Sequence, residues 1–249
     1  FVHGVMNTDN MSIHGLTIDY GPYGWLEDYN PGWTPNTTDS STRRYRYGQQ
    51  PQIAAWNIAR LLEAMVPLLD DPEKLHDVLS AYTTCFDQQH NQMWVDKLGL
   101  TEFCNEDEDM VRNLNSLLQE VETDMTIFFR LLCKLQSPNI EALTSAFYDE
   151  STIPVQAWNE WLEAWWSRVD GQPNREAMLQ ANPKYVLRNW MAQLAIDAAE
   201  SGDFSVCESL HDLLQNPYAE QPENEEQWFQ KRPEWARNRL GCSMLSCSS

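Results

Sequence analysis

The sequence has few basic residues. Its 249 residues include 17 Lys and Arg against 37 Asp and Glu, which gives a formal net charge of −20. Proteins that bind nucleic acid neutralise phosphates with clustered Lys and Arg, so this balance argues against a nucleic-acid partner. The acidic stretches at 106–109 and 223–226 are expected to be solvated helix starts and loops.

Long apolar runs and paired cysteines are also absent. No run of 18 or more apolar residues occurs, so the sequence predicts no transmembrane helix and no membrane partner. The six Cys residues include no C-x-x-C pair, which leaves a structural zinc site with little support. Cys85, Cys133 and Cys207 fall in helical patterns and are interpreted as packed thiols of a reduced, intracellular protein.

The first two dozen residues carry the pattern of a β-hairpin. The stretch 11–18 alternates apolar and polar residues around His14 and Gly15. A Gly in the second position of a two-residue turn is typical of a hairpin that needs positive φ. In the register this turn predicts, Met11 lies opposite Ile18.

The same register places Asn10 opposite Asp19. Opposite residues of an antiparallel pair have Cβ atoms roughly 4.5–5.5 Å apart, so the Asn10 amide oxygen and the Asp19 carboxylate are predicted to converge on one hard cation. Magnesium accepts a few protein oxygens together with phosphate and water oxygens. Asp9 would point the other way by strand alternation, which leaves its carboxylate available as a base.

This order of residues matches the catalytic end of a protein kinase, where a His-containing loop ends in a metal-binding Asn and precedes an Asp-x-Gly ligand. Set against H-R-D-x-x-x-x-N, His3 and Asn10 are in register, but Val5 occupies the position of the catalytic Asp. A conventional kinase is therefore disfavoured, and the carboxylate stands instead at Asp9.

The placement of the carboxylate at Asp9, directly before Asn10, is shared with a known family. The chain resembles the selenoprotein O (SelO, YdiU) family of kinase-like protein nucleotidyltransferases, a class of pseudokinase, across its whole length and in the right order. The strings that carry the resemblance are HGVMNTDNMS, IDYGPYG, LEDYNPGW at 26–33, GQQP at 48–51, NPKYVLRNW at 182–190, RPEW at 232–235 and SCSS at 246–249.

The resemblance implies a mainly α fold: a protein-kinase-like C-terminal lobe with a small β-hairpin at its catalytic end and an extended helical C-terminal region. It also implies a protein adenylyltransferase that moves AMP from ATP to Ser, Thr or Tyr hydroxyls of target proteins. Asn10 and Asp19 would hold Mg²⁺ or Mn²⁺ on the ATP phosphates, and Asp9 would take the proton of the acceptor hydroxyl. The expected location is cytoplasmic in a bacterium, with a mitochondrial one as the alternative in a eukaryote.

The chain begins at Phe1, almost inside the catalytic loop. The resemblance therefore implies that an N-terminal nucleotide-binding lobe is missing and that the fragment alone is inactive. We expect a catalytic loop, metal-binding hairpin and activation-segment-like loop at 1–48, a helical region at 49–215, and a Pro-rich polar tail at 216–249.

Helical periodicity begins near residue 52 and continues to the tail. The expected helices lie at about 52–69, 72–94, 106–132, 139–148, 154–168, 174–181, 184–200 and 204–215. Trp158, Trp161, Trp165 and Trp166 have the spacing of an aromatic core stripe. Arg188 either braces the active lobe or serves the local structure, and the sequence does not separate these roles.

The tail ends in two cysteines, Cys242 and Cys247. The resemblance implies a redox role for the terminal Cys, through a disulfide to a Cys in the activation-segment-like loop, but the corresponding position here is Pro35. A Cys242–Cys247 disulfide and an exposed Cys247 thiol both remain open. Three functional alternatives also stand beside AMP transfer: kinase-type phosphoryl transfer, a non-catalytic helical scaffold, and a thiol redox protein.

Overall fold

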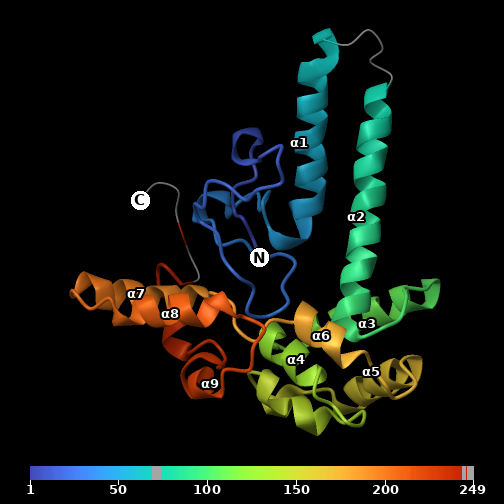
Figure 1. Ribbon diagram of the computed structural model, residues 1–249, viewed down its shortest axis with the longest axis vertical. Coiled ribbons are helices and arrows are strands. Elements are labelled where there is room, and N and C mark those ends of the chain that lie inside the picture. Colours follow the sequence, from blue (N-terminus) through green and yellow to red (C-terminus); the bar gives the residue numbers. More distant parts are fainter. Residues whose placement is uncertain (69–73, 243–244, 246–249) are drawn as a thin grey trace. The chain divides into compact units, whose positions relative to one another are not determined.

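The computed structural model describes residues 1–68, 74–242 and 245 and is mainly helical (Figure 1). The α-helices among them are α1 (Gln50–Met65), α2 (Lys74–Leu98), α3 (Asn105–Glu120), α4 (Met125–Leu132), α5 (Val155–Arg168), α6 (Arg175–Ala181), α7 (Asn189–Glu200), α8 (Ser205–Gln215) and α9 (Pro222–Trp228). Short 3-10 helices cover Thr8–Asn10, Thr37–Asp39, Tyr47–Gln49, Val66–Leu68, Ile140–Ala146, Glu150–Thr152 and Glu234–Ala236.

Extended strands are absent from the described part of the chain, where antiparallel and parallel backbone pairs occur only as isolated bridges. The mainly α prediction is therefore confirmed. None of the helices in the described ranges is long and apolar enough to cross a membrane.

The chain divides into two compact units. The first contains Phe1–Trp25, Asn30–His90 and Asn238–Ser249, and the second contains Leu26–Tyr29 and Asn91–Arg237. The first unit holds the predicted catalytic residues, α1 and most of α2, and the second holds the remaining helices.

Helix α1 confirms the predicted helical start near Pro51, which occupies the first turn where a missing N–H costs nothing. Its burial is less than the apolar pattern suggested, because Ile53 and Asn57 are its buried residues and Leu61 is half-exposed. Val78 on α2 is likewise half-exposed.

The helix expected over 106–132 is interrupted, and this part of the prediction is wrong. Helix α3 stops at Glu120, and Val121 is extended. The Asp124 side chain then accepts a hydrogen bond from the Ile127 N–H at 3.0 Å and caps the start of α4. A carboxylate that satisfies an N-terminal N–H favours a new helix start over continuation of the old one.

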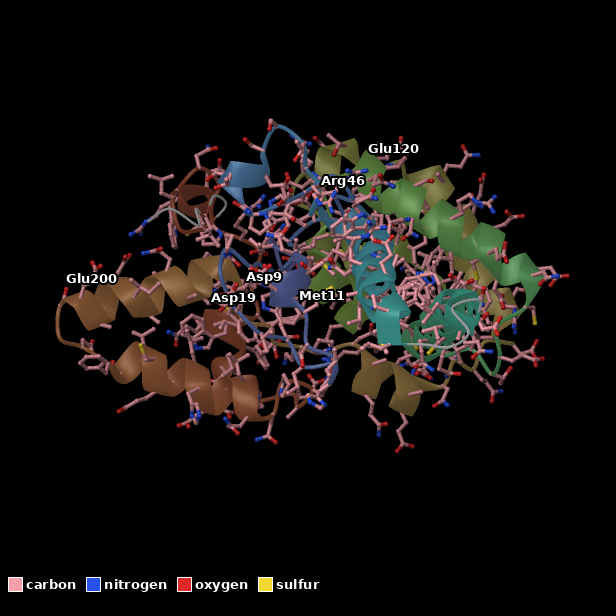
Figure 2. All side chains as sticks on the ribbon, turned by 90° about the horizontal axis from the view of Figure 1, so that it is seen from above. Asp9, Met11, Asp19, Arg46, Glu120 and Glu200 are labelled. Atoms are coloured by element: carbon pink, nitrogen blue, oxygen red, sulfur yellow. The ribbon has the colours of Figure 1, made fainter. Side chains whose placement is uncertain are left out.

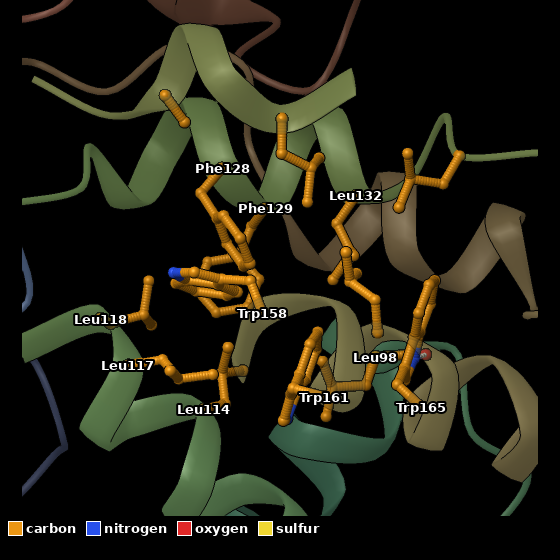
Figure 3. Packing of buried hydrophobic residues seen from close by; sticks show 14 of the residues in the cluster. Leu98, Leu114, Leu117, Leu118, Phe128, Phe129, Leu132, Trp158, Trp161 and Trp165 are labelled. Carbon is orange, nitrogen blue, oxygen red and sulfur yellow. Dashed lines mark hydrogen bonds between the residues drawn. The ribbon is translucent and has the colours of Figure 1, made fainter. Parts of the chain in front are cut away.

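The core of the second unit is built on the aromatic stripe of α5, as predicted (Figure 3). Trp158, Trp161 and Trp165 are buried. The Trp161 indole donates to the Met110 carbonyl and the Trp165 indole to the Leu98 carbonyl, each at 2.9 Å. These bonds tie α5 to α3 and to the end of α2 while removing large apolar surfaces from water.

A buried ion cluster joins three distant parts of the second unit. The Arg188 guanidinium donates to Glu27 Oε2 at 2.6 Å and to both carboxylate oxygens of Asp124, one of them at 2.9 Å. All three side chains are nearly inaccessible to solvent. Arg188 is therefore a bracing residue within this unit, and burial raises the pKa of Glu27 even beside it.

A second cluster gathers on Glu220. Its carboxylate accepts hydrogen bonds from Arg130 at 2.6 Å, Lys134 at 2.8 Å and Lys184 at 3.2 Å. Partial burial alone would raise the pKa of Glu220, but these donors outweigh it and lower the pKa from 4.5 to about 2. Lys184 belongs to the string NPKYVLRNW, so that string supplies a cation to both clusters.

Replacement of Arg188 by Met should lower the free energy of unfolding by about 3–5 kcal/mol, because Asp124 and Glu27 would stay buried without their main counter-charge. Arg112→Met removes an exposed ion pair with Asp109 and should cost at most about 1 kcal/mol. Urea denaturation followed by tryptophan fluorescence measures the free energy of unfolding of both variants. Equal decreases in the two variants would contradict the bracing role of Arg188.

The Glu220 cluster predicts a pH-dependent stability. Since the folded-state pKa of Glu220 lies below 4.5, its stabilising effect is present above that pH and is lost as the pH falls toward 2. Glu220→Gln should therefore destabilise the protein at pH 7, with a difference from the parent that shrinks below pH 4.5. Urea denaturation at a series of pH values tests this, with Glu141→Gln as the control for loss of one surface charge; a difference that stays constant down to pH 2 argues against it.

Candidate active site

The segment predicted to be the catalytic loop lies in the first unit and is closed by a backbone bridge. Val2 and Gly24 exchange N–H···O bonds of 2.8 and 2.9 Å. Between them Gly4 has a φ of +82°, and a Cβ built on it would lie 2.1 Å from the Pro22 carbonyl oxygen. The Gly of the His3-Gly4 pair is therefore required both by conformation and by close approach of the chain.

The predicted hairpin is not formed, and its register is wrong by one residue. A single bridge pairs Met11 with Thr17 instead of Ile18. The Gly15 N–H bonds to the Ser12 carbonyl at 3.1 Å, and the Ser12 hydroxyl accepts the His14 N–H at 3.2 Å. These local bonds make the turn longer than two residues, since a Ser side chain offers the backbone an alternative to strand pairing.

Asn10 and Asp19 nevertheless meet. The Asn10 amide nitrogen donates a hydrogen bond to Asp19 Oδ2. Asn10 is buried at the end of the 3-10 helix Thr8–Asn10, and Asp19 has a φ of +55°. The contact is therefore accompanied by a left-handed backbone at Asp19, which is uncommon for a residue other than Gly, and not by the predicted strand register.

Asp9 is exposed to solvent beside this pair. Figure 2 locates Asp9, Met11 and Asp19 in the same part of the first unit. Asp9 is therefore accessible from solvent.

Two residues that support the loop were not identified from the sequence as site residues. Nε2 of His3 lies 2.8 Å from the Ile18 carbonyl oxygen, while Nδ1 accepts the Val5 N–H at 3.4 Å. This pattern places the proton on Nε2, so the His3 ring donates to the residue directly before Asp19. The position of His3 in the H-x-D-like string was the available signal for this role.

Asn57 is the second of these residues. It is only 6% exposed, and its amide nitrogen donates to the Met6 carbonyl at 2.8 Å, which ties α1 to the catalytic loop. A polar residue inside an otherwise apolar helical stretch was the signal that could have revealed it. Gln50 of the GQQP string acts similarly, since it accepts the His3 N–H and donates to the Phe1 carbonyl, each at 3.0 Å.

The activation-segment-like loop is organised by Asp39. This buried carboxylate accepts the Thr42 hydroxyl at 2.6 Å and the N–H groups of Arg44 and Tyr45 at 2.8 and 2.7 Å. The Tyr45 hydroxyl in turn donates to the Asn7 side chain. The loop is thus bonded to the same stretch that carries Asp9 and Asn10.

The tail residue Leu245 pairs with this loop through backbone atoms. Its N–H donates to the Pro35 carbonyl and its carbonyl accepts the Thr37 N–H, each at 2.8 Å. Cys242 is buried. Cys247 lies outside the described residues, so its redox role stays a prediction.

The donor set of the Asn10–Asp19 pair fits a magnesium or manganese ion. Rotation of the Asn10 amide would turn its oxygen toward the Asp19 carboxylate, which gives two hard oxygen ligands to be completed by phosphate and water. Across the described ranges there is no cluster of three or more His, Cys, Asp or Glu that could hold a metal by itself.

Comparison with known proteins identifies the family of the chain. The family model of protein adenylyltransferase SelO matches residues 1–215. Curated relatives named protein nucleotidyltransferase YdiU are 50% identical in Flavobacterium johnsoniae, 49% in Aromatoleum aromaticum and 50% in Rhodopirellula baltica, each over 100% of this chain.

The family model covers most of the chain, and relatives of about 50% identity cover all of it. It belongs to the SelO family. The chain spans about half the length of the curated relatives it matches, namely 50%, 49% and 50% of the three proteins above.

Replacement of Gly4 by Ala should destabilise the first unit through both backbone strain and the clash with Pro22. Gly15→Ala is the matched control, because Gly15 also has positive φ, at +70°, but has no atom within 4 Å of a built Cβ. The control should show only the conformational cost of about 1–2 kcal/mol. Hydrogen exchange of residues 1–25 measures both, and equal protection in the two variants would refute the close-approach argument.

Proposed function

We propose that this chain forms the metal-binding and acceptor-binding part of a protein adenylyltransferase. The full-length enzyme would move AMP from ATP to Ser, Thr or Tyr hydroxyls of target proteins. The observation that carries this proposal is the contact between Asn10 and Asp19 beside the exposed Asp9, in a chain that belongs to the SelO family.

Asp9 is the proposed general base. An exposed carboxylate next to the phosphate site can accept a hydrogen bond from an incoming hydroxyl and take its proton as the oxygen attacks. The acceptor oxygen forms a bond to the α-phosphorus of ATP, and the bond from that phosphorus to pyrophosphate breaks. A protein–AMP ester and pyrophosphate are the products.

Asn10 and Asp19 are the proposed ligands of Mg²⁺ or Mn²⁺. When bound there, the cation would supply positive charge to the phosphate oxygens. The bond from His3 to the Ile18 carbonyl positions Asp19. The bond from Asn57 to the Met6 carbonyl holds the segment that leads to Asp9. These bonds keep the reacting groups in place before substrate arrives.

The nucleotide is proposed to need more polypeptide than these 249 residues. The curated relatives are about twice as long, and the family resemblance assigns an N-terminal nucleotide-binding lobe to the remaining length. In this proposal the chain is the kinase-like C-terminal lobe, residues 1–48 supply its catalytic end, and the 249-residue chain alone is inactive.

The decisive experiment is intact-mass spectrometry of the full-length protein incubated with ATP and Mg²⁺ or Mn²⁺. We expect addition of AMP to the protein or to an added substrate. Asp19→Ala and Asp9→Ala should each lower the rate by at least about 100-fold, in the range that loss of charge stabilisation or of a general base causes. Asp87→Ala, at an exposed position on α2, is the control and should keep the parental rate.

Other outcomes separate the alternatives. Addition of phosphate instead of AMP would show kinase-type phosphoryl transfer with a displaced base. Full activity of Asp19→Ala would refute the metal assignment. Absence of any transfer together with failure to bind Mg-ATP would favour a non-catalytic scaffold.

A further inference from the structure

The surface formed by the catalytic turn and α1 is unusually apolar for an exposed surface. Ile13 in the turn is 80% exposed, and Leu61 on α1 is 46% exposed. Met65 follows Leu61 at a spacing of four residues, so both lie on the same face of the helix, and Met65 is exposed as well. We call Ile13, Leu61 and Met65 the turn–α1 surface.

A cavity of about 370 Å³ opens on this surface, within the first unit. Thr8, Met11 and Ile13 line it from the catalytic loop and turn, and Ile58, Leu61 and Ala64 line it from α1. Asn10, the proposed metal ligand, lies between two of these lining residues in the sequence. Occupation of the cavity would thus support the backbone on both sides of Asn10.

Asn57 forms part of the cavity wall and ties it to the loop. The residue lines the cavity and is buried, its amide nitrogen is bonded to Met6, and its Oδ1 atom is buried without a hydrogen-bond partner. A buried carbonyl oxygen without a partner costs free energy. The folded loop bears this cost, because Oδ1 is closed to solvent and lies out of reach of a group that enters the cavity.

Two arguments identify the occupant as polypeptide from the remaining length of the full-length protein. The relatives contain about as many further residues as this chain, and apolar faces within one polypeptide normally cover one another. A second copy of the chain is disfavoured by charge, because each copy carries a formal charge of −20 and like charges oppose association.

We propose that the turn–α1 surface and its cavity are the docking site for a segment of the other half of the full-length protein. This segment places an apolar side chain in the cavity. Docking covers Ile13 and Leu61 and braces the loop that carries Asp9 and Asn10. The inference rests on the proposed function only in that it assumes a full-length protein of the relatives' length.

The test compares thiol labelling of single-site variants in the 249-residue chain and in the full-length protein. Ile13→Cys and Leu61→Cys report on the surface, and Ile196→Cys on α7 is the matched control, since Ile196 is 50% exposed. Each is treated with a maleimide, and labelling at each site is followed by peptide mass spectrometry. No nucleotide is required.

Labelling at Ile13→Cys and Leu61→Cys should be at least tenfold slower in the full-length protein, while Ile196→Cys should react within twofold of its rate in the short chain. Equal rates at the two test sites in both proteins would overturn the proposal. Protection that appears in the short chain as its own concentration is raised would also overturn it, in favour of a second copy.

The same full-length proteins distinguish this proposal from the proposed function. Protection of both sites without AMP transfer would support the docking site and count against the transferase. AMP transfer without protection would support the transferase and refute the docking site.

Discussion

Backbone groups in an irregular loop must find partners among side chains, and the first unit depends on this constraint. The segment that carries Asp9 and Asn10 has no strand or long helix to satisfy its N–H and C=O groups. His3, Asn36 and Asn57 meet the need, since they bond to the carbonyls of residues 18, 4 and 6 at 2.8, 3.0 and 2.8 Å. Each such bond costs side-chain freedom but fixes one point of the loop, which is how a stretch without regular structure becomes a rigid scaffold for chemistry.

The second unit meets a different constraint, the burial of charge. Arg188 faces two carboxylates in a region almost closed to water, so the cluster is stable only while all its members are present. Asp124 also caps α4. One carboxylate thus starts a helix and holds a cation at the same time. The bond from Arg188 to Glu27 brings together two strings that are far apart in the sequence, LEDYNPGW and NPKYVLRNW.

Sequence reasoning predicted the helical class, the aromatic core on α5 and the approach of Asn10 to Asp19. These follow from periodicity and from local order along the chain, which the residue types largely determine. The hairpin register was wrong because the Ser12 side chain bonds to the turn backbone, a competition of local bonds that alternation alone does not reveal. The break after Glu120 was missed because Asp124, which caps α4, also bonds to the distant Arg188. Apolar periodicity gives no sign of such a contact.

The support of the loop by Asn57 and the exposure of α1 could not be predicted from the sequence, for another reason. Apolar periodicity shows which face of a helix avoids water, but it does not say which partner covers that face. For α1 the partner is not found among the described residues of the first unit, so a strongly apolar helix retains an exposed face.

The pairing of Leu245 with Pro35 and Thr37 uses main-chain atoms on both sides of the bridge. Proline lacks an N–H, yet the bridge takes only its carbonyl, so nothing is lost by its presence at this position. A covalent link between tail and loop would require two cysteines to be kept together through evolution. A backbone bridge makes no such demand on Pro35 or Leu245, and the Thr37 hydroxyl adds a hydrogen bond to the Leu245 carbonyl at 2.9 Å.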